Sequence, residues 1–234
     1  MTSLRVLLRR AASLTLDELL PPRCALCAAY GAFLCAGCRD DLPVAGDDRC
    51  AICWQMVAAP LCPRCAEYGA GLTAVRAPFR YERGAQRLVT SVKYGGRFAL
   101  VGPMAELLAV VWPSYGLAAS AVVPVPLHRR RERSRGFNQA ALLARGLGTR
   151  LGLPVRDDVL VRVRSTPAQV RTASAAERRQ NVYGAFACRA EVADSALLLV
   201  DDVVTTGATF AACAEPLFAA GAAAVYGLAF ATAG

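Results

Sequence analysis

The 234-residue sequence contains one lysine, Lys93, and one histidine, His128, among its basic side chains. A single histidine excludes a catalytic dyad of two histidines and a histidine-rich metal site. Aromatic residues make up only 7%, which disfavours a stacking platform for single-stranded nucleic acid. Charged residues are also few, at 19%, while hydrophobic residues reach 55%, and this balance excludes a chain that is disordered throughout.

Two common phosphate-binding motifs are missing as well. The sequence contains neither GxxxxGK[ST] nor GxGxxG, which argues against a P-loop nucleoside triphosphatase and against a dinucleotide-binding domain. We expect no export signal in the first twenty residues, because arginines interrupt the apolar residues before Pro21. Residues 216–234 are uncharged but rich in alanine and glycine, and they predict a helix end followed by a strand. We expect a cytoplasmic protein with no membrane span.

Basic residues outnumber acidic residues by 27 to 18, which gives a net charge of +9. Residues 1–71 contain seven of each kind, so the whole excess lies in residues 72–234. A basic carboxyl-terminal part suits an anionic partner such as a phosphate or a nucleic acid. A solvated basic surface is the alternative interpretation.

Cysteine is abundant, and eight of the ten cysteines form four CxxC pairs within 42 residues. The segment is a repeat, because RCALC (23–27) recurs as RCAIC (49–53) and LCAGC (34–38) recurs as LCPRC (61–65). Each repeat holds four thiolates, the ligand set that a structural zinc ion prefers, with no open position for catalysis. The predicted ligands of two zinc ions are Cys24, Cys27, Cys35, Cys38, Cys50, Cys53, Cys62 and Cys65.

Two alternatives to that arrangement remain at this point. The first CxxC pair can share a metal with the third, and the second with the fourth, although each repeat already contains a complete set of four ligands. Disulfides are the other alternative, which the missing export signal disfavours. Cys188 and Cys213 have no CxxC partner, and we interpret them as small buried apolar residues.

The segment LLLVDDVVTTGATF, residues 197–210, carries the clearest chemical signal. Leu197 to Val200 predict a buried parallel strand that ends at Asp201 and Asp202. Residues 205–209 then form a turn, and a helix begins near Phe210. A strand, a small-residue loop and a helix start together offer backbone N–H groups and hydroxyls to a phosphate.

Two adjacent carboxylates beside a phosphate loop need a ligand that relieves their repulsion. Sugar hydroxyls can do so, and so can an intervening Mg²⁺ ion. A phosphorylated ribose with a metal-bound pyrophosphate satisfies both conditions. An ordinary strand–turn–helix with an exposed acidic pair is the alternative.

This stretch closely resembles the motif that binds 5-phosphoribosyl-1-pyrophosphate (PRPP) in type I phosphoribosyltransferases. The resemblance implies an α/β fold with a parallel sheet. It also implies that Asp201 and Asp202 contact the ribose hydroxyls, and that the following loop holds the 5-phosphate with Mg²⁺ accompanying PRPP. The implied PRPP-binding residues are Asp201, Asp202, Val204, Thr205, Thr206, Gly207, Ala208 and Thr209.

Two other segments are candidates for ligand contact. Residues 120–126 predict a strand whose end is stiffened by two prolines, followed by an arginine-rich loop and a helix over 137–150. The predicted pyrophosphate loop comprises Pro126, Leu127, His128, Arg129 and Arg135. Residues 162–186 predict a lid with a short helix near 175–183. Its candidate contacts are Arg164, Gln169, Arg178 and Asn181.

The cysteine module, PVPLHRRRERSRGFNQA, TPAQ…ERRQNVYGAF and VDDVVTTGAT together resemble the ComF-type competence protein family. The resemblance extends from about residue 20 to 230 and includes KYGGR (93–97). It implies a double zinc ribbon before a phosphoribosyltransferase-like domain, and a link to DNA uptake with partner proteins. After Gln169 the chain reads VRTASAAER, where relatives have a run one residue shorter.

We therefore predict an amino-terminal helix at 1–22, a double zinc ribbon at 23–66 and a phosphoribosyltransferase-like domain at 72–234. Residues 72–82 supply connecting strands, 83–112 are mainly helical, and the core spans about 118–232. One function is a transferase that binds PRPP with Mg²⁺ and moves ribosyl phosphate to or from an unknown acceptor. The alternative is a protein that handles single-stranded DNA during uptake, with the fold as a scaffold or PRPP sensor.

Overall fold

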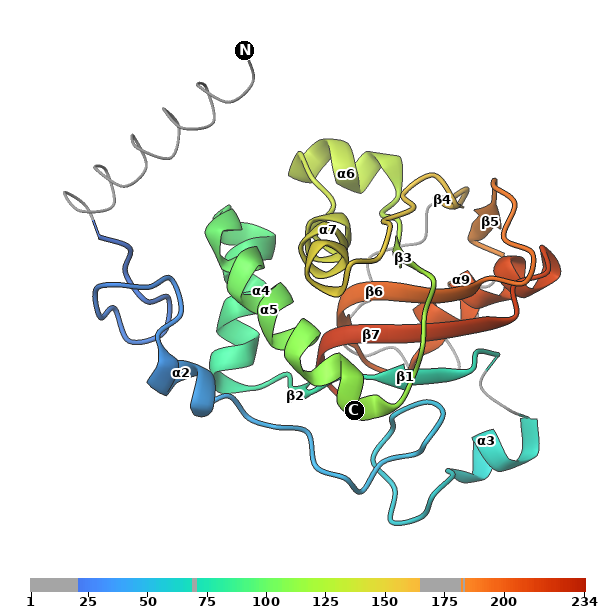
Figure 1. Cartoon of the computed structure of the whole chain (residues 1–234), viewed down its shortest axis with the longest axis horizontal. Helices are drawn as coiled ribbons and strands as arrows, with labels where there is room; N and C mark the ends of the chain where they lie inside the picture. Colours follow the sequence, from blue (N-terminus) through green and yellow to red (C-terminus); the bar gives the residue numbers. More distant parts are fainter. Residues whose placement is uncertain (1–20, 69–70, 165–181, 183) are drawn as a thin grey trace.

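A parallel β-sheet forms the centre of the molecule (Figure 1). The computed structural model describes residues 21–68, 71–164, 182 and 184–234. The strand order is β1 (Ala74–Arg76), β7 (Ala224–Thr232), β6 (Ala196–Val204) and β3 (Ala121–Pro124), and β2 (Phe79–Arg80) also pairs with β7. Every pairing in this sheet is parallel. The predicted α/β fold with a parallel sheet is therefore confirmed.

Both faces of the sheet are covered, as the apolar run in β6 requires. Leu197 and Leu199 point into one cluster of buried side chains, whereas Leu198 and Val200 point into the other. Helix α9 (Ala208–Ala219) packs in the first cluster. Helices α4 (Arg83–Gly95), α5 (Val101–Val111) and α7 (Gln139–Leu151) pack in the second. The period-two alternation of a strand thus divides the core into two layers.

Strand β6 is longer than the sequence indicates. The sequence predicts that it ends at the acidic pair, but the strand continues through Asp201 and Asp202 to Val204. The reason is its neighbour β7, which pairs with it along its whole length, from Ala196↔Ala224 to Val204↔Thr232. Helix α9 likewise begins at Ala208, two residues before the predicted start, after Gly207 in the left-handed conformation.

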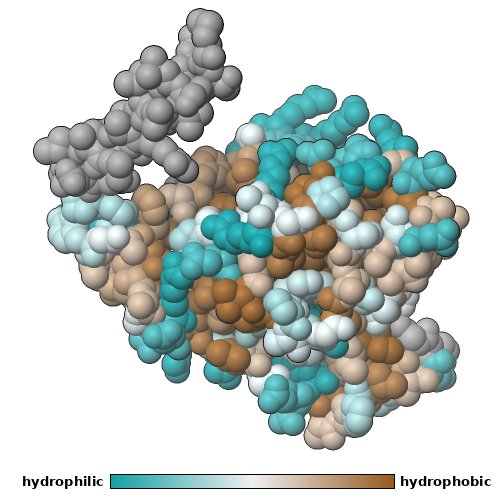
Figure 2. All heavy atoms as spheres, in the orientation of Figure 1, coloured by the Kyte–Doolittle hydropathy of each residue, from teal (hydrophilic) through white to brown (hydrophobic). Residues whose placement is uncertain are grey.

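The arginine-rich segment is a helix and not the predicted loop. Helix α6 spans Arg129–Arg135, and it begins where His128 Nδ1 accepts a hydrogen bond from the Arg130 amide at 3.2 Å. It ends at Gly136, whose φ of 81° suits a residue without a side chain. These caps and the helix propensity of arginine outweigh the repulsion within the run. Hydrophilic side chains gather over α6 in Figure 2.

The remaining elements frame the sheet. Strands β1 and β2, which were expected only as connections, are part of the main sheet. Strands β4 (Leu160–Arg162) and β5 (Phe186–Cys188) form a separate antiparallel pair. Short helices η1 (Phe98–Leu100) and η2 (Trp112–Tyr115) flank α5. Within the described residues, one helical stretch, Phe98–Tyr115, is long and apolar enough to cross a membrane by length and composition alone, which is weak support for a span.

The two cysteine modules pack on opposite faces of the sheet. Cys24 and Leu34 belong to the same buried cluster as α4, α5 and α7. Cys50 and Cys53 belong to the cluster that contains α9. Each module has one short helix, which begins directly after the third cysteine of the module and contains the fourth: α2 (Ala36–Asp40) in the first module and α3 (Pro63–Tyr68) in the second (Figure 1). The predicted helix over 1–22 lies almost wholly outside the described residues, and the predicted domain limits remain predictions.

Candidate metal centres and phosphate pocket

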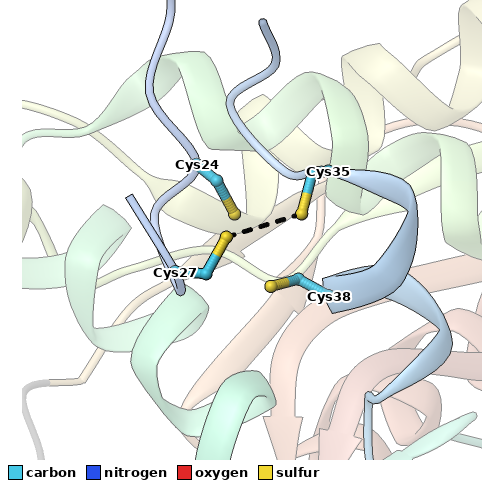
Figure 3. A group of neighbouring side chains, drawn as sticks. All are labelled: Cys24, Cys27, Cys35 and Cys38. Atoms are coloured by element: carbon cyan, nitrogen blue, oxygen red, sulfur yellow. Dashed lines mark hydrogen bonds between the residues drawn. The ribbon is translucent and has the colours of Figure 1, made fainter. Parts of the chain in front are cut away.

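Each cysteine repeat forms its own cluster of four thiols. Within each group, the four Sγ atoms all lie within 4.8 Å of one another. Figure 3 shows the first group, in which Cys24, Cys27, Cys35 and Cys38 point toward a common centre. The second group comprises Cys50, Cys53, Cys62 and Cys65. The pairing within each repeat is therefore the one present, and the cross-braced alternative is wrong.

The geometry of both groups fits a tetrahedral zinc ion. Zinc–sulfur bonds of about 2.3 Å place sulfur atoms about 3.8 Å apart along the edge of a tetrahedron. The Cys27–Cys35 and Cys53–Cys62 sulfur atoms lie 3.6 and 3.7 Å apart. No disulfide joins any of the ten cysteines, all of which lie in the described ranges.

Backbone amides favour the thiolate form that a metal requires at one sulfur atom of each group. Burial opposes ionisation of Cys24, but backbone N–H groups, including that of Leu26, outweigh it and lower the pKa of Cys24 to about 6. The corresponding Cys50 in the second repeat also has its pKa lowered to about 6, again by backbone N–H groups that outweigh burial. The last cysteine of each group shifts in the opposite direction, because hydrogen bonds with neighbouring thiols raise the pKa of Cys38, and burial together with neighbouring thiols raises the pKa of Cys65.

A pocket of about 350 Å³ opens at the carboxyl ends of β3 and β6. Its floor is the acidic pair and the loop that follows, and helix α6 contributes arginines to its wall. The lining includes every residue of the predicted PRPP motif, namely Asp201, Asp202, Val204, Thr205, Thr206, Gly207, Ala208 and Thr209. Ligands of open parallel sheets bind at this end of the strands.

A buried ion pair in the pocket joins α4 to β6. Lys93 Nζ lies 2.8 Å from Asp202 Oδ1, and the side chains are only 19% and 6% exposed. Burial opposes the charge on Lys93, but the Asp202 carboxylate outweighs it and raises the pKa of the lysine. The other oxygen, Asp202 Oδ2, is buried and has no hydrogen-bond partner among the described residues. A buried carboxylate oxygen without a partner is costly, and a ligand hydroxyl would satisfy it.

The neighbouring carboxyl, Asp201, is held partly in its acid form. Burial, together with the adjacent Asp202 charge, raises the pKa of Asp201 from 3.8 to about 7, although Lys93 and Arg162 offset part of the effect. Asp201 Oδ1 accepts a hydrogen bond from the Asp202 amide at 2.8 Å. The acid and ionised forms of Asp201 therefore both occur near neutral pH.

This raised pKa predicts a dependence of stability on pH. Between about pH 4 and pH 7 the folded chain keeps a proton on Asp201 that the unfolded chain has released, so stability falls as pH rises through this window. We expect Asp201→Asn to be more stable than the unsubstituted protein at pH 8, and equal to it near pH 4. The difference between 3.8 and about 7 corresponds to about 4 kcal/mol at pH 8, or a difference of about 8–16 °C in melting temperature. An equal difference at both pH values would contradict the assigned pKa.

The second cysteine module contacts the phosphate loop directly. The amide of Gln55, which lies between Cys53 and Cys62, donates a hydrogen bond to the Thr205 carbonyl. Arg49, beside Cys50, donates to the Gly234 carbonyl at 2.7 Å and to the Trp54 carbonyl at 3.0 Å. The second cysteine module and the phosphate loop are therefore in direct contact on this face of the sheet.

The other predicted contact residues divide into three groups. Pro126, Leu127 and Arg135 line the pocket, with Arg135 donating to Gln139 Oε1 at 2.6 Å. His128 caps α6 instead, and Arg129 lines a separate shallow hollow with Glu132 and Arg133. Arg164 is exposed and is not part of the lining described for the pocket. The remaining lid candidates, Gln169, Arg178 and Asn181, lie outside the described residues.

Several pocket residues are absent from the candidates predicted from sequence. Helix α4 contributes Lys93 and Tyr94, and Tyr81 lies between β2 and α4. Helix α6 contributes Arg131, and strand β4 contributes Arg162. The sequence does distinguish Lys93, because it is the one lysine in a chain whose other strongly basic residues are arginines. At this position a compact ammonium pairs with one carboxylate oxygen and leaves the second available.

Comparison with curated proteins shows relatives along most of the chain. The DNA utilization protein YhgH of Salmonella typhimurium strain LT2 is 33% identical over 218 residues, which is 82% of this chain and 93% of that protein. Competence protein F of Haemophilus influenzae is 30% identical over 76% of this chain and 87% of its own length. Competence protein ComFC of Streptococcus pneumoniae is 28% identical over 75% of this chain and 77% of its own length.

Comparison with solved structures finds phosphoribosyltransferases. Glutamine PRPP amidotransferase from B. subtilis overlaps 55% of this chain and 26% of its own, with 20% identity and a TM-score of 0.38. Adenine phosphoribosyltransferase from Leishmania tarentolae overlaps 59% of each chain, with 17% identity and a TM-score of 0.36. No protein-family model matches the chain. TM-scores this low indicate only a partial overlap of the structures. The fold assignment therefore rests on the parallel sheet and on the loop after β6.

Proposed function

Because the chain belongs to the family of the DNA utilization protein YhgH and competence protein F, we propose that its pocket binds PRPP together with Mg²⁺. The observation that carries this proposal is the buried Asp202 carboxylate, paired with Lys93 through one oxygen and unpartnered at the other. A ribose hydroxyl is a donor of the right kind for that free oxygen. The small-residue loop at 205–209 lies next to it and suits the 5-phosphate.

The cations of the pocket fit the other end of the same ligand. Arg131 and Arg135 line the wall formed by α6, and Arg162 lines the side formed by β4. A pyrophosphate group carries several negative charges, which arginine forks bind with charge-assisted hydrogen bonds. The bound Mg²⁺ would neutralise pyrophosphate charge, and Asp201 and Asp202 are the carboxylates placed to hold it or the ribose.

The reaction that suits this arrangement is transfer of ribosyl phosphate. The bond between ribose C1 and the pyrophosphate oxygen breaks, and its electron pair leaves with the pyrophosphate. A bond forms between C1 and a nitrogen of the acceptor, whose N–H proton passes to solvent. The chain contributes charge stabilisation of the departing pyrophosphate through its arginines. It also positions the ribose through the acidic pair.

We also propose that each four-cysteine group holds one zinc ion in a structural role. The sulfur spacing and the lowered pKa values of Cys24 and Cys50 support this assignment. Four thiolates fill the coordination sphere, so neither metal has a position for a reacting water. The second metal would keep Gln55 against the phosphate loop.

Substitution of a loop hydroxyl tests the PRPP site. Thr206→Val keeps the shape of the side chain and removes its oxygen, so we expect PRPP affinity to fall roughly 10-fold, as for loss of one hydrogen bond to a charged group. Thr149→Val is the matched control, because Thr149 is exposed and donates to the Arg145 carbonyl within α7. Equal affinity of the two variants, measured by calorimetry, would argue against phosphate binding in this loop.

A second candidate function is handling of single-stranded DNA during uptake or utilisation. The observation that favours it is α6, which presents five arginines and one glutamate within seven residues. The names of the similar proteins, which refer to competence and to DNA utilization, support the same function. In this case the phosphate pocket serves as a PRPP sensor or remains as part of the scaffold. DNA-uptake proteins would then be the partners.

A further inference from the structure

The two cysteine groups differ in how far they are shielded from solvent. In the second group, three of the four cysteines are at most 4% exposed. In the first group one cysteine is buried, two are half-buried and Cys27 is exposed. Cys27 and Cys53 are the second ligands of their modules and occupy equivalent positions of the repeat. The same ligand is therefore open to solvent in one module and buried in the other.

The difference follows from how each module packs on the sheet. The second module packs in the cluster around α9 through Cys53. The first module packs on α4, where Leu26 lies so close to Gly84 that a Cβ atom added there would approach it to 3.0 Å. Cys24 belongs to the apolar cluster on that side, whereas Cys27 is not among the residues packed against it. The contact with α4 therefore leaves one edge of the first group uncovered.

The exposed thiol has a second sulfur atom beside it. Cys27 Sγ lies 3.6 Å from Cys35 Sγ, and both point toward the centre of the group (Figure 3). A bound metal ion holds its cysteine ligands as thiolates, and a thiolate that solvent reaches is the form that peroxides oxidise. A neighbouring thiolate can then close a disulfide. The equivalent pair, Cys53 and Cys62, is 3.7 Å apart, but Cys53 is only 2% exposed.

We propose that Cys27 is an oxidation site at which hydrogen peroxide releases the zinc ion of the first module. The inference rests on the proposed zinc centres and adds a reactivity that distinguishes them. The Cys27 thiolate attacks peroxide, so an S–O bond forms, the O–O bond breaks and hydroxide leaves. The Cys35 thiolate then attacks the oxidised sulfur, so an S–S bond forms and a second hydroxide leaves. The two thiolates together lose two electrons to the peroxide, and solvent protons convert both hydroxides into water.

Loss of two of the four ligands releases the ion and loosens the first module. Arg39 of this module is paired with Glu106 of α5 at 2.7 Å, and Arg87 of α4 donates to the Leu26 carbonyl at 3.1 Å. Both contacts depend on the shape of the module, which the metal maintains. The bond from Gln55 to the phosphate loop belongs to the second module and is retained. Oxidation therefore changes the surface over α4 and α5 and spares the phosphate loop.

The test follows release of zinc from the fully loaded protein in hydrogen peroxide, with a chromophoric chelator as the indicator. We expect one of the two ions to leave roughly 10-fold faster than the other, because exposure sets the rate of thiolate oxidation. Peptide mass spectrometry of the unsubstituted protein should then find a disulfide between Cys27 and Cys35. A thiol reductant with added zinc should restore both ions.

Replacement of Cys27 by histidine separates the exposed thiolate from the metal site. Three cysteines and one histidine are an ordinary ligand set for structural zinc, and the exposed position leaves room for the ring. Cys27→His should therefore keep two ions per chain and lose the fast phase of release. Cys188→Ala is the control, because Cys188 is a half-buried cysteine outside both metal groups. Its zinc release should match that of the unsubstituted protein.

Three results would overturn the oxidation site. They are release of both ions at one rate, a fast phase that survives in Cys27→His, and a first disulfide within the second group of the unsubstituted protein. Fewer than two zinc ions per chain before peroxide is added would be a different failure, because it would overturn the metal assignment and this inference with it. The zinc count at the start thus distinguishes the two proposals.

Discussion

Replacing Asp201 and Asp202 together by asparagine is expected to weaken Mg²⁺-dependent binding of PRPP at least 100-fold. The substitution removes the negative charge that attracts a metal–pyrophosphate complex. It also replaces the Asp202 carboxylate, one oxygen of which has no partner, by a carboxamide. A carboxamide oxygen accepts hydrogen bonds less strongly than a carboxylate oxygen. Calorimetric titration with PRPP and Mg²⁺ measures the loss.

The chain supplies a matched control for that experiment. Asp157 and Asp158 form another adjacent acidic pair, but they are exposed and bonded to Arg145 and Arg156 on the surface. Asparagine at both of these positions should leave PRPP affinity unchanged. Zinc content should remain two ions per chain in both double variants. Equal PRPP affinity of the Asp201/Asp202 variant and the unsubstituted protein would refute the site assignment.

Loss of the second metal is expected to affect the phosphate loop more than loss of the first. Structural zinc contributes on the order of 10 kcal/mol per site, which is comparable to the whole stability of an ordinary domain. Cys50, Cys53 and Cys65 are at most 4% exposed and share a core with α9, whereas Cys27 of the first module is exposed. Collapse of the second module would also withdraw Gln55 from the Thr205 carbonyl.

The repeat offers a direct comparison of equivalent positions. Cys38→Ser and Cys65→Ser each remove the last ligand of one module. We expect hydrogen exchange at residues 203–209 to rise at least 10-fold in Cys65→Ser and to change little in Cys38→Ser. Zinc release to a chromophoric chelator confirms that each variant has lost one ion. Equal exchange rates in the two variants would show that the second module does not support the loop.

Much of the site follows from local sequence. The apolar run, the acidic pair and the small-residue loop at 197–210 predict a strand followed by a phosphate loop, because each feature depends on neighbouring residues. The CxxC repeats likewise favour pairing within each repeat, but the cross-braced alternative is excluded only by the positions of the sulfur atoms in the structure. The length of β6 does not follow, since the ladder with β7 extends it past the acidic pair.

The less predictable parts depend on contacts between distant segments. The arginine run predicts a loop on charge alone, but His128 and Gly136 cap it as a helix. Lys93 comes from α4, 109 residues before its partner Asp202, and nothing in its local sequence specifies that pair. The two cysteine repeats are almost identical in pattern, yet among the described hydrogen bonds it is the second repeat that bonds to the phosphate loop, through Gln55.

The most direct test of the central claim is calorimetric titration of the zinc-loaded protein with PRPP, in the presence and absence of Mg²⁺. The pocket at the ends of β3 and β6 predicts saturable binding of one PRPP per chain that tightens when Mg²⁺ is present. Absence of binding under both conditions would contradict a PRPP site in this protein. The parallel sheet would then serve as a scaffold for DNA handling.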